Sequence, residues 1–168
     1  ESGDQVHSST NFYKSGTTLE ANTFKVSVSK EGYSNNTYIQ IREDASEIFD
    51  NKIDAYKLFG YSQNPQIYTS DNNDLYSINC LPMDMESYNL VLGVKAFSED
   101  IYAINFEGIE NILDHYTLKL HDLKTNTIVP ITDALEYPFS FHDGDNEQRF
   151  EIQFNSITGV EEDIANNW

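Results

Sequence analysis

Oxygen-bearing side chains gather in the segment 49–58, which separates two long stretches of strand-like sequence. Asp50, Asn51 and Asp54 stand close together there, and carboxylate and amide oxygens are the ligands that Ca²⁺ prefers. Apolar residues beside them would anchor such a loop against the rest of the fold. We therefore predict a calcium site at these three residues, and the alternative is a turn that holds no metal.

Two further clusters offer the same kinds of oxygen donor. None of the three clusters has the spacing of an EF-hand loop, and hairpin turns rich in Asn and Asp have the same composition without a metal. The two clusters are therefore alternative positions for calcium. They consist of Asp71, Asn73 and Asp74, and of Asp143, Asp145 and Glu147.

Aromatic side chains in or beside loops suggest a second kind of chemistry. Tyr33, Tyr61 and Tyr68 are such residues, and an exposed ring with a nearby amide or acid is a typical platform for a sugar. Most tyrosines in a strand-rich protein pack within the sheet, however. Carbohydrate binding through Tyr33, Tyr61 and Tyr68 is therefore a prediction beside the plainer reading as packing residues.

Catalytic motifs are not found in the sequence. It contains neither a G-x-S-x-G nucleophile elbow nor a glycine-rich phosphate loop, and its histidines lack the spacing of a zinc motif. We therefore expect a domain that is not an enzyme. The four histidines are His7, His115, His121 and His142.

Composition excludes several classes of partner. The chain has 168 residues and a net charge of −18, because 28 acidic residues face only 10 basic ones. Such a charge repels nucleic acids and anionic membranes, and no apolar segment is long enough to insert into a bilayer. The single cysteine, Cys80, cannot form an internal disulfide, and its apolar surroundings favour a buried thiol over a nucleophile.

Short alternating segments dominate the chain and determine the predicted fold. Phe24, Val26 and Val28 alternate with polar residues, and Ile39 and Ile41 do so after a turn, which predicts an antiparallel hairpin. The later segments 137–141 and 150–154 alternate in the same way around the turn 143–147, and we expect them to be antiparallel neighbours in one core. Many short strands separated by turns favour an all-β fold, an antiparallel β-sandwich of jelly-roll or Greek-key type.

Domain boundaries follow from where this alternation begins and ends. Residues 1–18 are polar and are predicted to form an extended lead-in, with residues 19–157 as the β-sandwich domain. Residues 158–168 lose the alternation and become acidic. We interpret this tail as a linker toward a C-terminal sorting domain that is absent from the sequence.

Several runs occur in an order that resembles a known bacterial region. That region is the β-rich segment immediately before the C-terminal sorting domain of proteins exported by the type IX secretion system in Bacteroidetes. The resemblance covers the chain from about residue 24 to residue 168. The runs are FDNKIDAYKL, IYTS after Pro65, LYSINCLP, LVLGV, YTLKLHDLKTNTIVPI, YPFSF, QRFEIQF and the tail TGVEEDIANNW.

The resemblance implies a cellular location and a role without a catalytic residue. It implies that the chain is part of a larger secreted protein, or of one anchored at the outer cell surface. We therefore expect a non-catalytic module that serves in adhesion, as a spacer or in binding glycans or other cell-surface molecules. The alternative is a carbohydrate-binding module of a secreted hydrolase, and the domains upstream would distinguish the two.

Overall fold

The computed structural model describes residues 22–60 and 63–157, and these residues form an all-β structure. The prediction of this class is confirmed, because the only helix among them is the four-residue α1 (Glu110–Leu113). No helix in the described ranges has the length and apolar character needed to cross a membrane. The predicted lead-in 1–18 and linker 158–168 lie outside these ranges. The strands are β1 (Thr23–Lys30), β2 (Tyr33–Arg42), β3 (Ala55–Tyr56), β4 (Gln66–Asp71), β5 (Asp74–Pro82), β6 (Ser87–Lys95), β7 (Asp100–Glu107), β8 (Tyr116–Asp122), β9 (Thr127–Pro130), β10 (Glu136–Phe141) and β11 (Phe150–Ser156).

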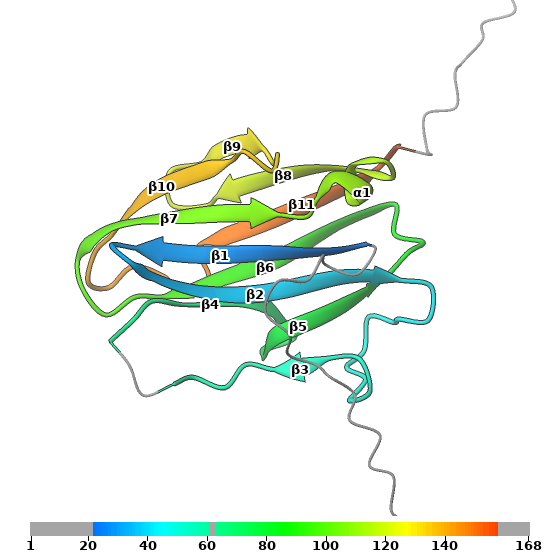
Figure 1. Cartoon of the computed structure of the whole chain (residues 1–168), viewed down its shortest axis with the longest axis horizontal. Helices are drawn as coiled ribbons and strands as arrows, with labels where there is room; N and C mark the ends of the chain where they lie inside the picture. Colours follow the sequence, from blue (N-terminus) through cyan, green and yellow to red (C-terminus); the bar gives the residue numbers. More distant parts are fainter. Residues whose placement is uncertain (1–21, 61–62, 158–168) are drawn as a thin grey trace, which may run out of the picture.

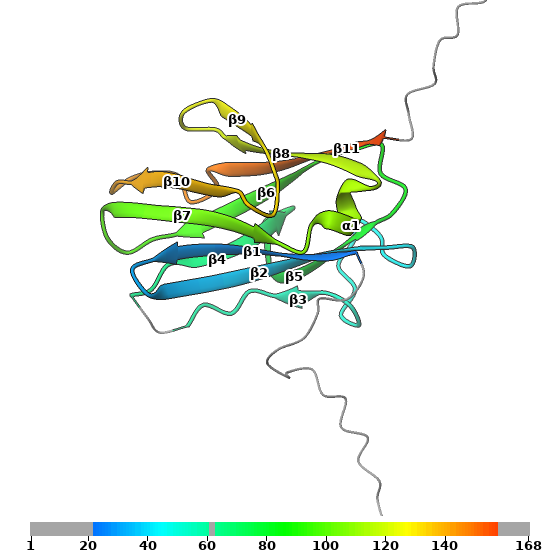
Figure 2. The same ribbon diagram turned by 45° about the horizontal axis from the view of Figure 1, so that its top comes forward.

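The strands join into one sheet that curls into a half-barrel (Figure 1, Figure 2). The strand order is β10-β7-β1-β2-β5-β4-β6-β11-β8-β9, and β3 lies beside β5. β2 and β5 run parallel, whereas the other described pairs are antiparallel, so the sheet is mixed. An antiparallel sandwich of jelly-roll or Greek-key type is therefore not confirmed.

The core fills the inside of the curl. Alternate residues of a strand point to the same face, so each alternating segment contributes one apolar row. Helix α1 closes one end of this core with Ile112, and Ile109 just before it is also fully buried. The largest fully buried side chains are Phe24, Phe150, Phe154, Ile39, Ile67, Leu90, Leu92, Ile104, Ile109, Ile112, Leu120 and Ile131.

The predicted hairpin at the start of the domain is confirmed. β1 and β2 pair antiparallel, with Phe24 opposite Ile39 and Val28 opposite Asn35. Gly32 has a φ of +82° in the turn between them, a backbone conformation that glycine adopts without steric cost. The hairpin is a local structure, which is why the alternation of its two segments was sufficient to predict it.

The predicted pairing of the segments 137–141 and 150–154 is wrong. β10 pairs with β7, whereas β11 lies between β6 and β8. The two strands nevertheless share the core, because the rings of Phe139 and Phe150 meet edge to face at a centroid distance of 4.9 Å. Alternation specifies which face of a strand is apolar but not which strand lies beside it.

The connection between β2 and β4 contains the segment 49–58 with its cluster of oxygen-bearing side chains. It crosses from Arg42 to Gln66, and β3 holds its middle against β5. Ala55 pairs with Ile78, and the Lys57 backbone N–H donates a hydrogen bond of 2.7 Å to the Leu75 carbonyl. Residues 43–54 adopt neither a strand nor a helix.

Candidate functional site

Asp54 fastens the loop 43–54 to the sheet through its carboxylate. Oδ1 accepts the backbone N–H of Cys80 at 2.8 Å, and Oδ2 accepts the backbone N–H of Asp50 at 2.8 Å. Asp50 in turn accepts the Lys52 N–H at 2.9 Å. Two of the three predicted calcium ligands therefore serve as turn-forming residues here, a role that short acidic side chains fill well.

Cys80 lies under this loop and is buried, as the sequence predicted. Its Sγ atom is 3.3 Å from the Ile53 carbonyl oxygen, which accepts a hydrogen bond from the thiol. Burial, with the charge of Asp54 adding to it, raises the pKa of Cys80 to about 12. The thiol is therefore protonated at neutral pH and serves as a small packing group.

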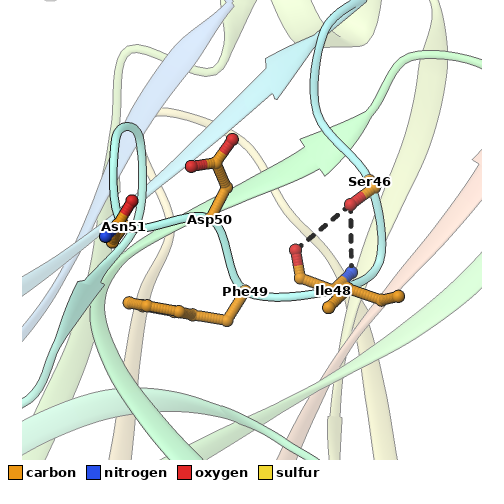
Figure 3. A pocket seen from close by; sticks show the side chains of 5 residues that line it. All are labelled: Ser46, Ile48, Phe49, Asp50 and Asn51. Carbon is orange, nitrogen blue, oxygen red and sulfur yellow. Dashed lines mark hydrogen bonds between the residues drawn. The ribbon is translucent and has the colours of Figure 1, made fainter.

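A shallow open hollow of about 500 Å³ lies on this loop. Ser46, Ile48, Phe49, Asp50 and Asn51 line it (Figure 3). Ser46 Oγ accepts the Ile48 N–H at 3.3 Å and donates to the Ile48 carbonyl at 3.1 Å, so a small hydrogen-bonded turn shapes one wall. The hollow thus combines a carboxylate, an amide and a hydroxyl with apolar side chains.

A stack of aromatic rings adjoins the hollow. The rings of Phe49 and Tyr56 lie nearly parallel, with centroids 4.1 Å apart and planes inclined by 9°, and Tyr76 packs against both. Tyr56 remains 47% exposed, and neighbouring Ile48 and Leu58 are exposed still further. Tyr56 follows Asp54 by two residues, and this position in the sequence is the signal that its ring borders the polar loop.

The three tyrosines predicted to bind a sugar differ in their exposure to solvent and in whether the structure describes them. Tyr33 is 56% exposed at the start of β2, and Tyr61 lies outside the described residues. Tyr68 presents no exposed ring, which corrects the prediction for this residue, because only 2% of it is accessible. Its ring covers Gly93 and meets Phe59 edge to face, and its hydroxyl donates to Glu147 at 3.3 Å.

The other acidic clusters also form turns. Asp71 pairs with Asp74 across the β4–β5 turn, where Asn72 and Asn73 have φ angles of 47° and 73°. Asp145 accepts hydrogen bonds from Lys124 Nζ to both oxygens at 2.7 Å. Within residues 22–60 and 63–157, no three His, Cys, Asp or Glu side chains converge as a metal site would require. Calcium binding stays a prediction.

Comparison of the chain with models of protein families, with curated proteins and with solved structures finds no match. The candidate site therefore rests on its own geometry, which is an exposed aromatic ring beside a polar hollow.

Proposed function

We propose that this domain is a non-catalytic binding module of an exported cell-surface protein. The observation that carries the proposal is the exposed ring of Tyr56, stacked on Phe49 beside the hollow that contains Asp50 and Asn51. Tyrosine offers a large contact area at a small cost in conformational entropy, and stacking on Phe49 restrains the ring before a ligand arrives.

Carbohydrate is the ligand class that this surface favours. Sugars place their apolar C–H face on an aromatic ring while their hydroxyls bond to amides and carboxylates at the edge. Tyr56 would supply the ring, and Asp50 and Asn51 the polar edge. The same arrangement supports the second candidate function, a carbohydrate-binding module of a secreted hydrolase.

Export and the finer fold class belong to the same proposal. The resemblance to the region before a type IX sorting domain supports a location outside the cell, and the net charge of −18 disfavours nucleic acids as partners. A β-sandwich type of domain is supported by the facing halves of the half-barrel, whose strands β10 and β11 meet through Phe139 and Phe150.

Binding is tested by titrating the domain with soluble cello-, xylo-, chito- and malto-oligosaccharides in a calorimeter. We expect Tyr56→Ala to weaken binding about tenfold or more, which corresponds to about 1.4 kcal/mol. Phe97→Ala is the control, because Phe97 is an aromatic residue of similar exposure, 46%, that does not line the hollow. Equal binding by Tyr56→Ala and the unmodified domain would remove this surface as the binding site.

Location is tested separately with an antibody raised against the domain. We expect it to label intact cells of the source organism and expect protease treatment of intact cells to remove the signal. Labelling that requires permeabilised cells would contradict the proposed export, whatever the sugar titrations show.

A further inference from the structure

Lys57 is in an unusual setting for a cation in so acidic a chain. Its Nζ atom donates a hydrogen bond of 2.7 Å to the side-chain oxygen Oδ1 of Asn35 on β2. No ion pair joins Lys57 to a carboxylate within the part of the chain that the structure describes. By contrast, Lys25, Lys30 and Lys124 each pair with an acid. The amine of Lys57 thus faces a neutral carboxamide.

Burial makes this amine a better nucleophile. It lowers the pKa of Lys57 to about 8, so a useful fraction of the side chain is uncharged near neutral pH. Desolvation without a carboxylate partner favours the uncharged amine of a lysine. In that state the nitrogen lone pair can attack a carbonyl.

The side-chain carbonyl of Asn35 is held in contact with Lys57 and is polarised by two donors. Its Oδ1 atom accepts a second hydrogen bond, of 2.9 Å, from the backbone N–H of Ile67. Two donors converge on this atom, which identifies it as the amide oxygen, because an NH₂ group would accept neither. A backbone N–H aimed at a carbonyl oxygen also stabilises the negative charge that develops there when a nucleophile adds.

The leaving group has a route to solvent. The Nδ2 atom of Asn35 makes no hydrogen bond among the described residues, and it is not one of their buried unpaired atoms. It therefore remains accessible to water and can depart as ammonia.

From these contacts we infer that Lys57 and Asn35 form an intramolecular isopeptide bond. Lys57 Nζ attacks Asn35 Cγ and a new C–N bond forms. The Cγ–Nδ2 bond then breaks, and Nδ2 leaves as ammonia with the proton that Nζ releases. The exchange of one amide for another needs no oxidant, metal or activated co-reactant. The fold favours the reaction by holding the two groups in contact, which makes it intramolecular.

The bond would fasten the connection between β2 and β4 to the sheet. Among the described residues, this stretch is held to β5 by the short strand β3, the Lys57 N–H and a few side-chain hydrogen bonds such as that of Asp54 with Cys80. A covalent link between residues 35 and 57 would restrain the unfolded chain as a disulfide does, in a protein whose single cysteine cannot form one internally. This inference does not depend on the proposed function.

Mass spectrometry of the purified chain tests the inference. We expect an intact mass lower than the sequence mass by about 17 Da, the mass of ammonia. Tandem spectra of a digest should contain one branched peptide in which Lys57 is joined to Asn35. Lys57→Arg and Asn35→Ala should each restore the full mass of their own sequence, and circular dichroism checks that they fold.

Two results would overturn the inference. One is an unmodified chain at its full sequence mass after prolonged incubation in the folded state. The other is a loss of ammonia that the tandem spectra assign elsewhere, such as to a succinimide at another asparagine. Both results are measured on the chain without substitutions. A variant that fails to fold therefore does not affect the test.

Discussion

Arg149 and Asp122 form a bidentate ion pair inside the half-barrel. Arg149 Nε donates to Asp122 Oδ1 at 2.7 Å, and Nη2 donates to Oδ2 at 2.6 Å. Arg149 Nη1 also donates to the carbonyl of Ser140 on β10 at 2.7 Å, and the Tyr137 hydroxyl donates to Asp122 at 3.0 Å. Because β10 has no backbone pairing with β8 or β11, these side chains join the two ends of the sheet.

Removing one member of this pair should destabilise the fold strongly. Asp122→Ala leaves the guanidinium of Arg149 buried without its carboxylate, which typically costs about 3–5 kcal/mol. Urea denaturation measures the loss. The control is Glu107→Ala, which breaks the more exposed pair with Lys25 and should cost less than about 1 kcal/mol. Equal losses in the two variants would show that the Asp122 pair has no special role.

The same pair should give stability a defined dependence on pH. Burial alone would raise the pKa of Asp122, but the hydrogen bonds and charge of Arg149 outweigh it and hold the pKa below its ordinary value. A carboxylate whose pKa falls on folding contributes stability above its unfolded pKa of about 3.9, and this contribution is lost as the pH falls through the folded pKa.

The difference in unfolding free energy between the unmodified domain and Asp122→Asn should therefore be constant from about pH 7 to about pH 5 and shrink below about pH 4. Urea titrations at a series of pH values measure this difference. Other carboxylates with lowered pKa values, such as Asp44 and Asp100, are present in both proteins and cancel. A difference that stays constant down to the lowest pH would contradict the prediction.

Phe139 should be a major contributor to the core. Its ring contacts Phe150 at 4.9 Å and Tyr102 at 5.9 Å between centroids, and the Arg149 guanidinium lies 5.2 Å from its centre. Phe139→Ala should cost about 3–5 kcal/mol in a denaturant titration. Ile101→Ala on the adjacent strand β7 is the control, since Ile101 is 68% exposed. A loss below about 1 kcal/mol for Phe139→Ala would indicate a solvated face.

Gly93 is required by the ring of Tyr68. A Cβ atom at position 93 would lie 2.2 Å from Tyr68 Cζ, so Gly93→Ala must displace the ring and should cost about 1–3 kcal/mol. The test is a double-mutant cycle with Tyr68→Ala, measured by denaturant titration. We expect Gly93→Ala to be much less destabilising when Tyr68 is already alanine, and additive losses would exclude the steric explanation.

Calcium at Asp50, Asn51 and Asp54 is tested by melting the domain in calcium and in a chelator. We expect a higher melting temperature in calcium than in the chelator, because a cation that binds only the folded state stabilises it by mass action. The double variant Asp50→Asn, Asp54→Asn should lose this shift. Identical melting temperatures would remove the site, and a shift that persists in the variant would move it to one of the other acidic clusters.

Local features of the fold could be predicted from the sequence. The β1–β2 hairpin has two alternating segments with a turn between them, and the Asn72–Asn73 turn has residues that tolerate a positive φ. The buried thiol of Cys80 followed from its apolar neighbours. In each case the residues that determine the structure are close together in the chain.

Relationships between distant residues could not be predicted. The parallel pairing of β2 with β5 and the placement of β10 beside β7 depend on partners that alternation does not identify. Tyr68 is buried because Gly93, on another strand, leaves room for its ring. Asp122 and Arg149, and likewise Asn35 and Lys57, meet only when separate strands are brought together, so their spacing in the sequence contains no motif.

The two strands at the ends of the sheet order, β10 and β9, each contain an exposed proline, Pro138 and Pro130. Among the described residues each of these strands has a backbone pairing with one neighbour only, so its other edge is an unpaired one there. Proline has no N–H to donate. An edge strand that contains it therefore cannot form a continuous row of backbone hydrogen bonds with another chain. When many copies of this half-barrel are crowded together, these two prolines disfavour edge-to-edge pairing between them.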